Sequence, residues 1–411
     1  MKNLKINLKF VIILCFLFFY VEGNSQQLEI YMNEALSNNP EIQKFELQYS
    51  IVSEKVNEVN SVPNTEFGVG YFVSEPETRT GAQRFKVSVK QMIPWFGSIT
   101  AREGYVSSLA DAKYEDITIA KRKLMVSVSQ SYYNLYAYKA KQKVFVENIE
   151  LLKTYETLAL TSLEVGKASV VDVLRLQMRQ NEIQQLLDVL MRQFIAEQTT
   201  FNKLLNRDKD IKVNVIKELL IPLEFFEVNS GNLELHPELL KFDKLYYSIE
   251  QSELLNQKES NPMIGFGLDY INVEKRPNLD FSDNGKDIIM PMVSISIPIF
   301  NNKYKSKTKQ NELQQQEILS QKQERFNTLE TLLEKAVNNR ISARISYKTQ
   351  SKNLKQAKSA QDILMKSYET GRIDFNDVLD IQELQLKFQI NQVESIRKYY
   401  RQSTIINYLK Q

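Results

Sequence analysis

Side chains that carry out covalent chemistry are scarce in this sequence. Its 411 residues include one histidine, His236, and one cysteine, Cys15. A Ser/His/Asp nucleophile set needs a histidine in an ordered site, but His236 directly precedes Pro237, a pattern typical of a helix start. A structural zinc site needs several Cys and His ligands at close spacing, which the sequence lacks. We therefore interpret His236 as a helix-start residue and expect no bound metal, no cofactor and no catalytic constellation.

One segment partly matches a phosphate-binding loop. It reads Gly166-Lys167-Ala168-Ser169, but Thr161 replaces the upstream glycine and no strand precedes it. Most carboxylates lie among Lys and Arg on expected helix faces, where a solvated surface is usual. Asp377 and Asp380 are three residues apart and share one helix face. By itself this pair suits the first turn of a helix, where acidic residues complement the helix dipole.

The elements around these residues occur twice. Residues 162–178 and 367–383 match at a constant offset of 205 positions. The coinciding pairs are Ser162/Ser367, Glu164/Glu369, Gly166/Gly371, Asp172/Asp377, Val173/Val378, Leu174/Leu379 and Gln177/Gln382. Further matches pair residues 39–49 with 236–246, 63–71 with 262–270, and 89–96 with 293–300. A period of about half the chain indicates a duplicated unit rather than a solenoid.

We therefore expect a first repeat at 26–210 and a second at 236–411, joined by a segment at 211–235. Each repeat reads helix, strand, strand, long helix, glycine turn, helix. The expected strands lie at residues 64–73, 84–93, 263–271 and 288–299. Their apolar residues alternate with polar or small ones, which suits a sheet wet on one face or the lipid-facing wall of a membrane barrel.

The first 25 residues predict a secretory signal peptide. Three lysines precede the apolar run Phe10–Val21, and Gly23-Asn24-Ser25 supplies small residues for cleavage after Ser25. The run of 12 residues falls short of the about 20 that a membrane-spanning helix needs. Since Cys15 lies inside the signal, the mature chain has no thiol chemistry. Its 50 basic and 49 acidic residues nearly balance after removal of three Lys and one Glu, so we expect no nucleic-acid partner.

Two very long helices are expected, because residues 105–165 and 302–370 contain neither Gly nor Pro. Leu319, Phe326 and Leu333 recur every seven residues, the seam spacing of a coiled coil. A fibrous coiled coil is the alternative, but the strands and the duplication argue against it. Four strands cannot close a membrane barrel, which needs about eight. If these strands lie in a membrane the chain must oligomerise, and three copies supply twelve strands around a pore.

In this arrangement the sequence is similar to the TolC-type outer membrane efflux proteins over nearly all of the mature chain. Three features carry the resemblance: the element order, Gln91-Met92-Ile93-Pro94-Trp95-Phe96-Gly97 at a strand-to-helix junction, and Tyr368-Glu369-Thr370-Gly371 followed by Asp377-Val378-Leu379-Asp380. The junction segment is most like the heavy-metal and cation branch. The resemblance implies a mixed α and β membrane protein, in which a long α-helical barrel continues into a β-barrel with four strands per chain, closed as a homotrimer.

The resemblance also implies the function. The protein would be the outer membrane channel of a tripartite efflux system, exporting drugs, metal cations or other small molecules passively, and not an enzyme. Its helical part would lie in the bacterial periplasm. Its partners would be further copies of itself, a periplasmic membrane-fusion adaptor, an inner-membrane pump and outer membrane lipid. Some relatives carry an N-terminal lipidated cysteine that this chain lacks, so the barrel alone would hold it.

Site residues follow from the same resemblance. Gly166 and Gly371, with Arg372, would form the periplasmic hairpin tips where the adaptor docks. Asp377 and Asp380 would face the lumen, and in a trimer they would form carboxylate rings that favour cations. The remaining gate candidates are Asp172, Arg175 and Tyr368.

The two repeats differ at this gate. Arg175 occupies the position of Asp380, and we expect it to pair with Asp377 or Asp380 of a neighbouring hairpin and hold the entrance shut. Where the family often has a basic residue, Ile373 stands here. The alternative function is a periplasmic coiled-coil adaptor or interaction protein of an export system. That reading explains the helices but not four alternating strands.

Overall fold

The computed structural model describes residues 23–166, 169–222, 233–370 and 372–410. Most of the expected signal peptide and Gly371 therefore lie outside the described residues. The chain divides into two compact units. Unit 1 is drawn from Met1–Gln43, Thr118–His236 and Phe326–Gln411, and unit 2 from Lys44–Ile117 and Pro237–Arg325. Each unit thus takes segments from both expected repeats.

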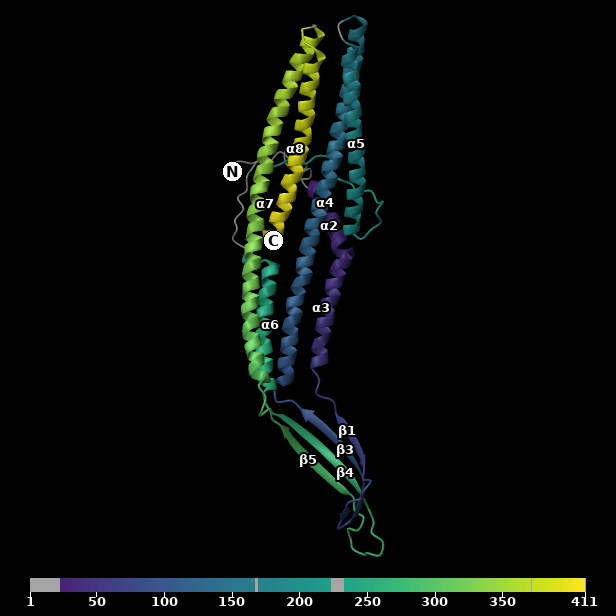
Figure 1. The fold of residues 1–411 in the computed structure, drawn as a ribbon, viewed down its shortest axis with the longest axis vertical. Helices are drawn as coiled ribbons and strands as arrows, with labels where there is room; N and C mark the ends of the chain where they lie inside the picture. Colours follow the sequence, from purple (N-terminus) through teal and green to yellow (C-terminus); the bar gives the residue numbers. More distant parts are fainter. Residues whose placement is uncertain (1–22, 167–168, 223–232, 371, 411) are drawn as a thin grey trace, which may run out of the picture. The chain divides into compact units, whose positions relative to one another are not determined.

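The two halves of the chain carry similar elements in the same order (Figure 1). The first half contains α2 (Gly23–Asn38), α3 (Pro40–Val59), β1 (Glu66–Tyr71), β2 (Glu77–Thr78), β3 (Gly81–Ile93), α4 (Ser98–Glu164) and α5 (Val170–Leu204). The second half contains η1 (Leu233–Leu235), α6 (Pro237–Glu259), β4 (Met263–Glu274), β5 (Ile288–Ser296), α7 (Lys303–Glu369) and α8 (Phe375–Lys410). Helices α4 and α7 have 67 residues each. None of the helices in the described residues is both long and apolar enough to cross a membrane.

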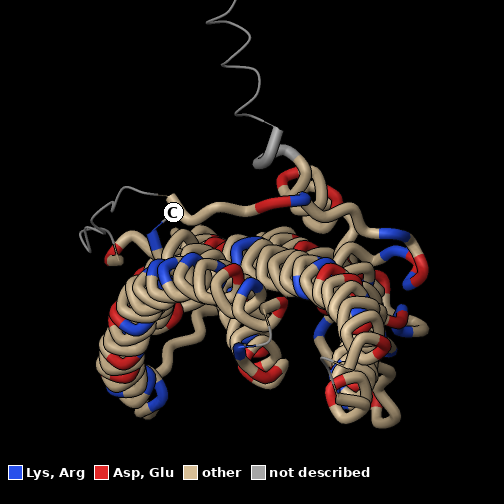
Figure 2. Tube along the Cα trace, turned by 90° about the horizontal axis from the view of Figure 1, so that it is seen from above, with Lys and Arg blue, Asp and Glu red and all other residues tan. Residues whose placement is uncertain are grey.

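Unit 1 is built from helices whose core joins residues far apart in the sequence. Parts of α4 and α7 pack with α5 and α8 around completely buried side chains. These are Leu152, Leu176, Ile183, Phe375 and Val378. Acidic and basic side chains are interspersed along the helices (Figure 2). Burial of the apolar side chains on the inner face of each helix therefore holds the helices of unit 1 together, while charged side chains of both signs cover the solvent-exposed faces.

Unit 2 combines helices with one antiparallel sheet of strand order β1-β3-β4-β5, and β2 pairs with the start of β3. Strands β3 and β4 come from different halves of the chain and pair from Ala82 with Glu274 to Ile93 with Ile264. Both expected repeats therefore contribute to a single sheet. On the helical side of unit 2, ion pairs of 2.6 Å each connect Lys241 with Asp116 and Lys244 with Glu115, which joins α6 to α4.

The observed strands differ from the expected ranges mainly at their ends. β5 ends at Ser296 rather than 299, because Pro298 has no N–H to donate to a strand ladder. β3 begins at Gly81, three residues earlier than expected, where it pairs with β2. β2 itself was not expected, since two residues are too few for alternation to reveal a strand.

His236 lies directly before α6, at the expected helix start. Its side chain is buried, its Nε2 lies 3.2 Å from the Tyr408 carbonyl oxygen, and its ring packs edge to face on the Tyr408 ring. At the matching position before α3, the Asn39 Oδ1 accepts a hydrogen bond from the Glu41 N–H at 2.9 Å. Within the described part of the chain, no group of three or more His, Cys, Asp or Glu side chains is placed to hold a metal ion.

Candidate functional site

The sheet of unit 2 has one apolar face that its own chain leaves uncovered. Strand register places directly paired residues on the same face, and these pairs include Phe67 with Val89 and Val69 with Val87. The full apolar set is Phe67, Val69, Tyr71, Phe85, Val87, Val89, Ile264, Phe266, Leu268, Tyr270, Ile289, Val293 and Ile295. Val69 is 81% exposed and Val293 is 70% exposed. An apolar surface of this extent is unusual for a protein surrounded by water.

The opposite face of the sheet is mixed: it carries small, polar and charged side chains beside apolar ones such as Ile271 and Met292. Lys86 forms an ion pair with Asp269, whose side chain is fully buried. A Cβ at Gly265 would lie 2.3 Å from the Ser294 Oγ and 2.6 Å from the Met92 Sδ, so a larger residue there would displace both side chains. Ser88 donates a hydrogen bond to the Gly68 carbonyl oxygen at 3.3 Å. A sheet with one apolar face, whose other face carries the charged and small polar groups, has the pattern expected of a wall between lipid and water.

The sheet also has two open edges. Strand β1 pairs only with β3, and β5 pairs only with β4, among the strands that the structure describes. Each therefore presents unpaired N–H and C=O groups along its outer side. Such edges are templates for pairing with another chain.

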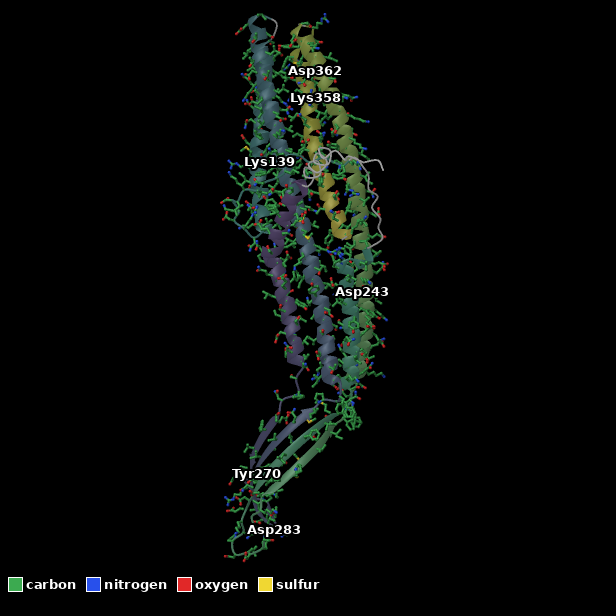
Figure 3. The ribbon with its side chains drawn as sticks, turned by 180° about the vertical axis from the view of Figure 1, so that it is seen from behind. Lys139, Asp243, Tyr270, Asp283, Lys358 and Asp362 are labelled. Atoms are coloured by element: carbon green, nitrogen blue, oxygen red, sulfur yellow. The ribbon has the colours of Figure 1, made fainter. Side chains whose placement is uncertain are left out.

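The loops at the end of the sheet away from the helices are tied to each other. Figure 3 shows Tyr270 on the sheet and Asp283 in the loop beyond it. Arg79, from the first hairpin, forms an ion pair with Asp283. Arg276, from the second, contacts Glu77 at 2.8 Å. These ion pairs join the two hairpin ends.

The turn between α4 and α5 has the local geometry that its residues predict. Gly166 has φ +70°, the left-handed conformation that glycine adopts without strain, and it ends the helix as expected. Ser169 caps α5, since its Oγ accepts a hydrogen bond from the Val171 N–H at 3.1 Å. The Asp172 carboxylate completes the capping box by accepting from the Ser169 N–H at 3.1 Å. The structure thus gives Asp172 a role within its own helix start.

The turn between α7 and α8 is anchored by an aromatic cluster. Phe375, the first residue of α8, is completely buried. Its ring centroid lies 4.9 Å from that of Tyr368 on α7 and 5.8 Å from that of Tyr155 on α4. Phe375 therefore joins the two helical hairpins. Sequence reasoning missed this residue, because the repeat has Val170 at the corresponding position and no aromatic pattern to signal it.

Tyr368, a predicted gate residue, is 7% exposed within this cluster. Burial raises the pKa of its phenol, the neighbouring Ser162 hydroxyl opposes this shift, and the Asp172 carboxylate adds to it. The structure therefore brings Tyr368 and Asp172, from different hairpins, close together. The phenol remains neutral at physiological pH.

Within one chain, Arg175 contacts the second hairpin. Arg175 Nη1 donates a hydrogen bond to the Asn376 Oδ1, and the described residues of the chain show no ion pair from Arg175 to Asp377 or Asp380. Both aspartates are exposed. The arginine thus reaches the second hairpin, but it contacts the amide beside the carboxylates.

Two further polar contacts link helices of unit 1. Gln382 Nε2 donates to the Asn148 Oδ1 at 2.9 Å, and the Gln382 side chain is completely buried. Glu394 accepts a hydrogen bond from Lys141 at 3.1 Å and also pairs with Arg397. Burial raises the pKa of Glu394, but the hydrogen bonds and charges of Arg397 and Lys141 outweigh it and leave that pKa below its usual value. Of these residues, the sequence repeat had singled out Gln382, because it matches Gln177 of the first repeat.

No family model and no curated protein matches the chain. Solved structures do match its fold. The outer-membrane channel OprN is 14% identical, with a TM-score of 0.76 over 94% of this chain and 90% of that one. CusC, described for its transmembrane channel formation, is 14% identical with a TM-score of 0.76 over 93% and 92%. The Vibrio cholerae outer membrane protein VceC is 14% identical with a TM-score of 0.73 over 94% and 96%. The expected resemblance is thus confirmed at the level of the fold: this chain has the fold of the TolC-type outer membrane channels.

Proposed function

We propose that three copies of this chain form an outer membrane channel for the passive export of small molecules. The single observation that carries this proposal is the sheet, which exposes an apolar face, carries its charged side chains on the other face and leaves both edges unpaired. The fold likeness to outer-membrane channels supports it independently.

Strand direction favours closure between copies. Successive strands β1, β3, β4 and β5 alternate in direction. The β1 edge of a second copy can therefore pair antiparallel with the β5 edge of the first and continue the alternation. Four strands per copy fall short of the about eight needed for a barrel. Three copies supply twelve, and closure satisfies edge groups that would otherwise be unpaired in lipid.

Strand length fits a membrane. β5 has nine residues, which at about 3.4 Å each and a tilt of about 40° rise roughly 23 Å, close to the apolar band of about 25 Å on outer membrane barrels. The apolar face would then contact lipid. The face with Lys86, Ser88, Asp269 and the glycines would line a water-filled lumen.

The helical hairpins supply the periplasmic end of this duct. Gly166 and the segment around Arg372 form tips on which a periplasmic adaptor would dock, and an inner-membrane pump would deliver the substrate. The gate is proposed at Asp377 and Asp380, with Arg175 beside them. The contact of Arg175 with Asn376 supports a position for this arginine next to the carboxylates.

Fractionation tests the proposal. The protein should be recovered from detergent-extracted outer membranes as a trimer, measured by mass determination of the detergent complex. The purified trimer should conduct ions in a planar bilayer. Recovery as a water-soluble monomer without conductance would contradict the proposal and favour the periplasmic adaptor alternative.

A further inference from the structure

Exposed apolar side chains gather where strands run into helices. Trp95 and Phe96 lie between β3 and α4, and Ile299 and Phe300 lie between β5 and α7. Phe96 is 82% exposed, Ile299 71% and Phe300 100%, while Trp95 packs edge to face on Phe96. We name these four residues the junction belt. A wholly exposed phenylalanine gains nothing from its own chain, so this belt is a contact surface for something else.

The two halves of the junction belt lie at the same end of the sheet. Strands β3 and β5 both pair antiparallel with β4, so they run in the same direction. Both strands then end at the helical side of unit 2 (Figure 1). The belt is continuous with the apolar sheet face, because Val293 and Ile295 lie on β5 just before Ile299. It therefore occupies the level at which the lipid-facing band ends.

Positive charge follows the junction belt directly. Helix α7 begins with Lys303, Lys305, Lys307 and Lys309, and its first acidic residue is Glu312. Glu312 pairs with Lys309 at 2.8 Å. For Lys303, Lys305 and Lys307, which we name the junction lysines, the described residues provide no ion pair.

Two acidic residues of α6, Glu253 and Glu259, are already engaged by other partners. Glu259 pairs with Arg102 at 2.8 Å. Glu253 accepts hydrogen bonds from Thr308 at 2.9 Å and from Asn311 at 2.8 Å, both on α7. The junction lysines are therefore available to an anion from outside the protein.

We propose that the junction is a binding surface for anionic phospholipid. The belt lies at the boundary between acyl chains and headgroups, and Lys303 and Lys307, which are four residues apart on one helix face, contact lipid phosphates. Aromatic rings prefer this boundary, and lysines near an anionic leaflet are attracted to it. From Lys303 to Lys307 the helix rises about 6 Å, which matches a headgroup layer of roughly 5–7 Å on each side of the bilayer. The inference rests on the proposed function, since it requires the sheet to lie in a membrane.

The experiment uses Trp95, which is the only tryptophan in the chain. The full-length trimer is placed in vesicles of equal anionic and zwitterionic phospholipid, with brominated chains on one lipid class at a time. Bromine quenches indole fluorescence at short range. Bromine near the headgroup should quench Trp95 more than bromine near the chain end. Brominated anionic lipid should quench more than brominated zwitterionic lipid, reflecting about a fivefold local excess for one fully engaged lysine.

Replacing all three junction lysines by glutamine should reduce this preference to about equal quenching. The control removes three exposed lysines from a later part of the same helix. These are Lys348→Gln, Lys352→Gln and Lys355→Gln. The control should keep the preference, because its charge change is identical but lies more than forty residues further along α7.

Each other outcome has a distinct meaning. Equal quenching by both lipid classes in the wild type overturns the lipid site but leaves the channel intact. Absence of quenching by either class contradicts the proposed membrane position of the sheet. Loss of the preference on adding inorganic phosphate, at constant ionic strength, shows that the lysines bind phosphate in general and overturns a lipid-specific surface.

Discussion

Adjacent residues on β3 offer a direct test of which sheet face contacts lipid. Val87 is the seventh of the thirteen residues of β3 and lies on the apolar face between Val69 and Tyr270. Ser88, one residue later, lies on the polar face opposite Asp269. Val87→Lys and Ser88→Lys introduce the same charge at the same depth. Only the face differs.

The two variants are expected to lower the free energy of unfolding by amounts that differ several-fold. A lysine facing lipid at the membrane midplane destabilises a barrel by about 2–4 kcal/mol, or roughly 6–12 kcal/mol for three copies. Ser88→Lys loses a hydrogen bond to Gly68, which is worth about 1 kcal/mol, and gains a carboxylate neighbour in Asp269. Val87→Lys should therefore lower the stability of the proposed trimer much more than Ser88→Lys.

Urea unfolding of the protein in lipid vesicles measures the difference, followed by Trp95 fluorescence. Val87→Ile serves as a matched control, with an expected cost below about 1.5 kcal/mol. Equal destabilisation by the two lysine variants, or a Val87→Lys protein as stable as the wild type, would refute the assignment of the faces. It would leave the sheet without a lipid-facing side.

Four further predictions concern the helical unit. Gly166→Ala should lower the stability of the turn by about 1 kcal/mol, because alanine is strained at φ +70°. Hydrogen exchange of the amides at the α4–α5 turn measures this loss, and unchanged exchange rates would argue against backbone strain there. Phe375→Ala should lower the free energy of unfolding by about 3–5 kcal/mol, since it empties a completely buried site. Thermal unfolding of the purified protein measures the loss, and an unchanged midpoint would contradict the anchoring role of Phe375. Arg175→Ala and Asp380→Ala should each raise single-channel conductance in a planar bilayer, and unchanged conductance in both would remove these residues from the gate. The pKa of Glu394 is lowered in the folded state, so the ionised carboxylate stabilises the fold above about pH 4.5, and this stabilisation is lost as the pH falls through the folded-state pKa. In Glu394→Gln, the free energy of unfolding should therefore decrease less steeply on acidification. An identical dependence in the wild type and the variant would show that Glu394 does not contribute to it.

The sequence by itself determined the features that depend on neighbouring residues. Alternation of apolar side chains indicated the strands, because successive residues of a strand point to opposite faces. The absence of Gly and Pro indicated the long helices, and Gly166 with Ser169 indicated the turn and cap between α4 and α5. All of these rest on hydrogen bonds and steric limits within a few positions of the chain. They were therefore visible before the fold was known.

Only the tertiary structure decided which distant residues meet. Phe375 packs on Tyr155, 220 positions earlier, and Arg175 contacts Asn376 of the second hairpin. The pairing of β3 with β4 joins the two halves into one sheet, and through it Lys86 meets Asp269. Such contacts depend on how helices and strands pack in space, and local residue patterns carry no information about them. The apolar face of the sheet could thus be anticipated from alternation, whereas the neighbours of Arg175 and Phe375 required the folded chain.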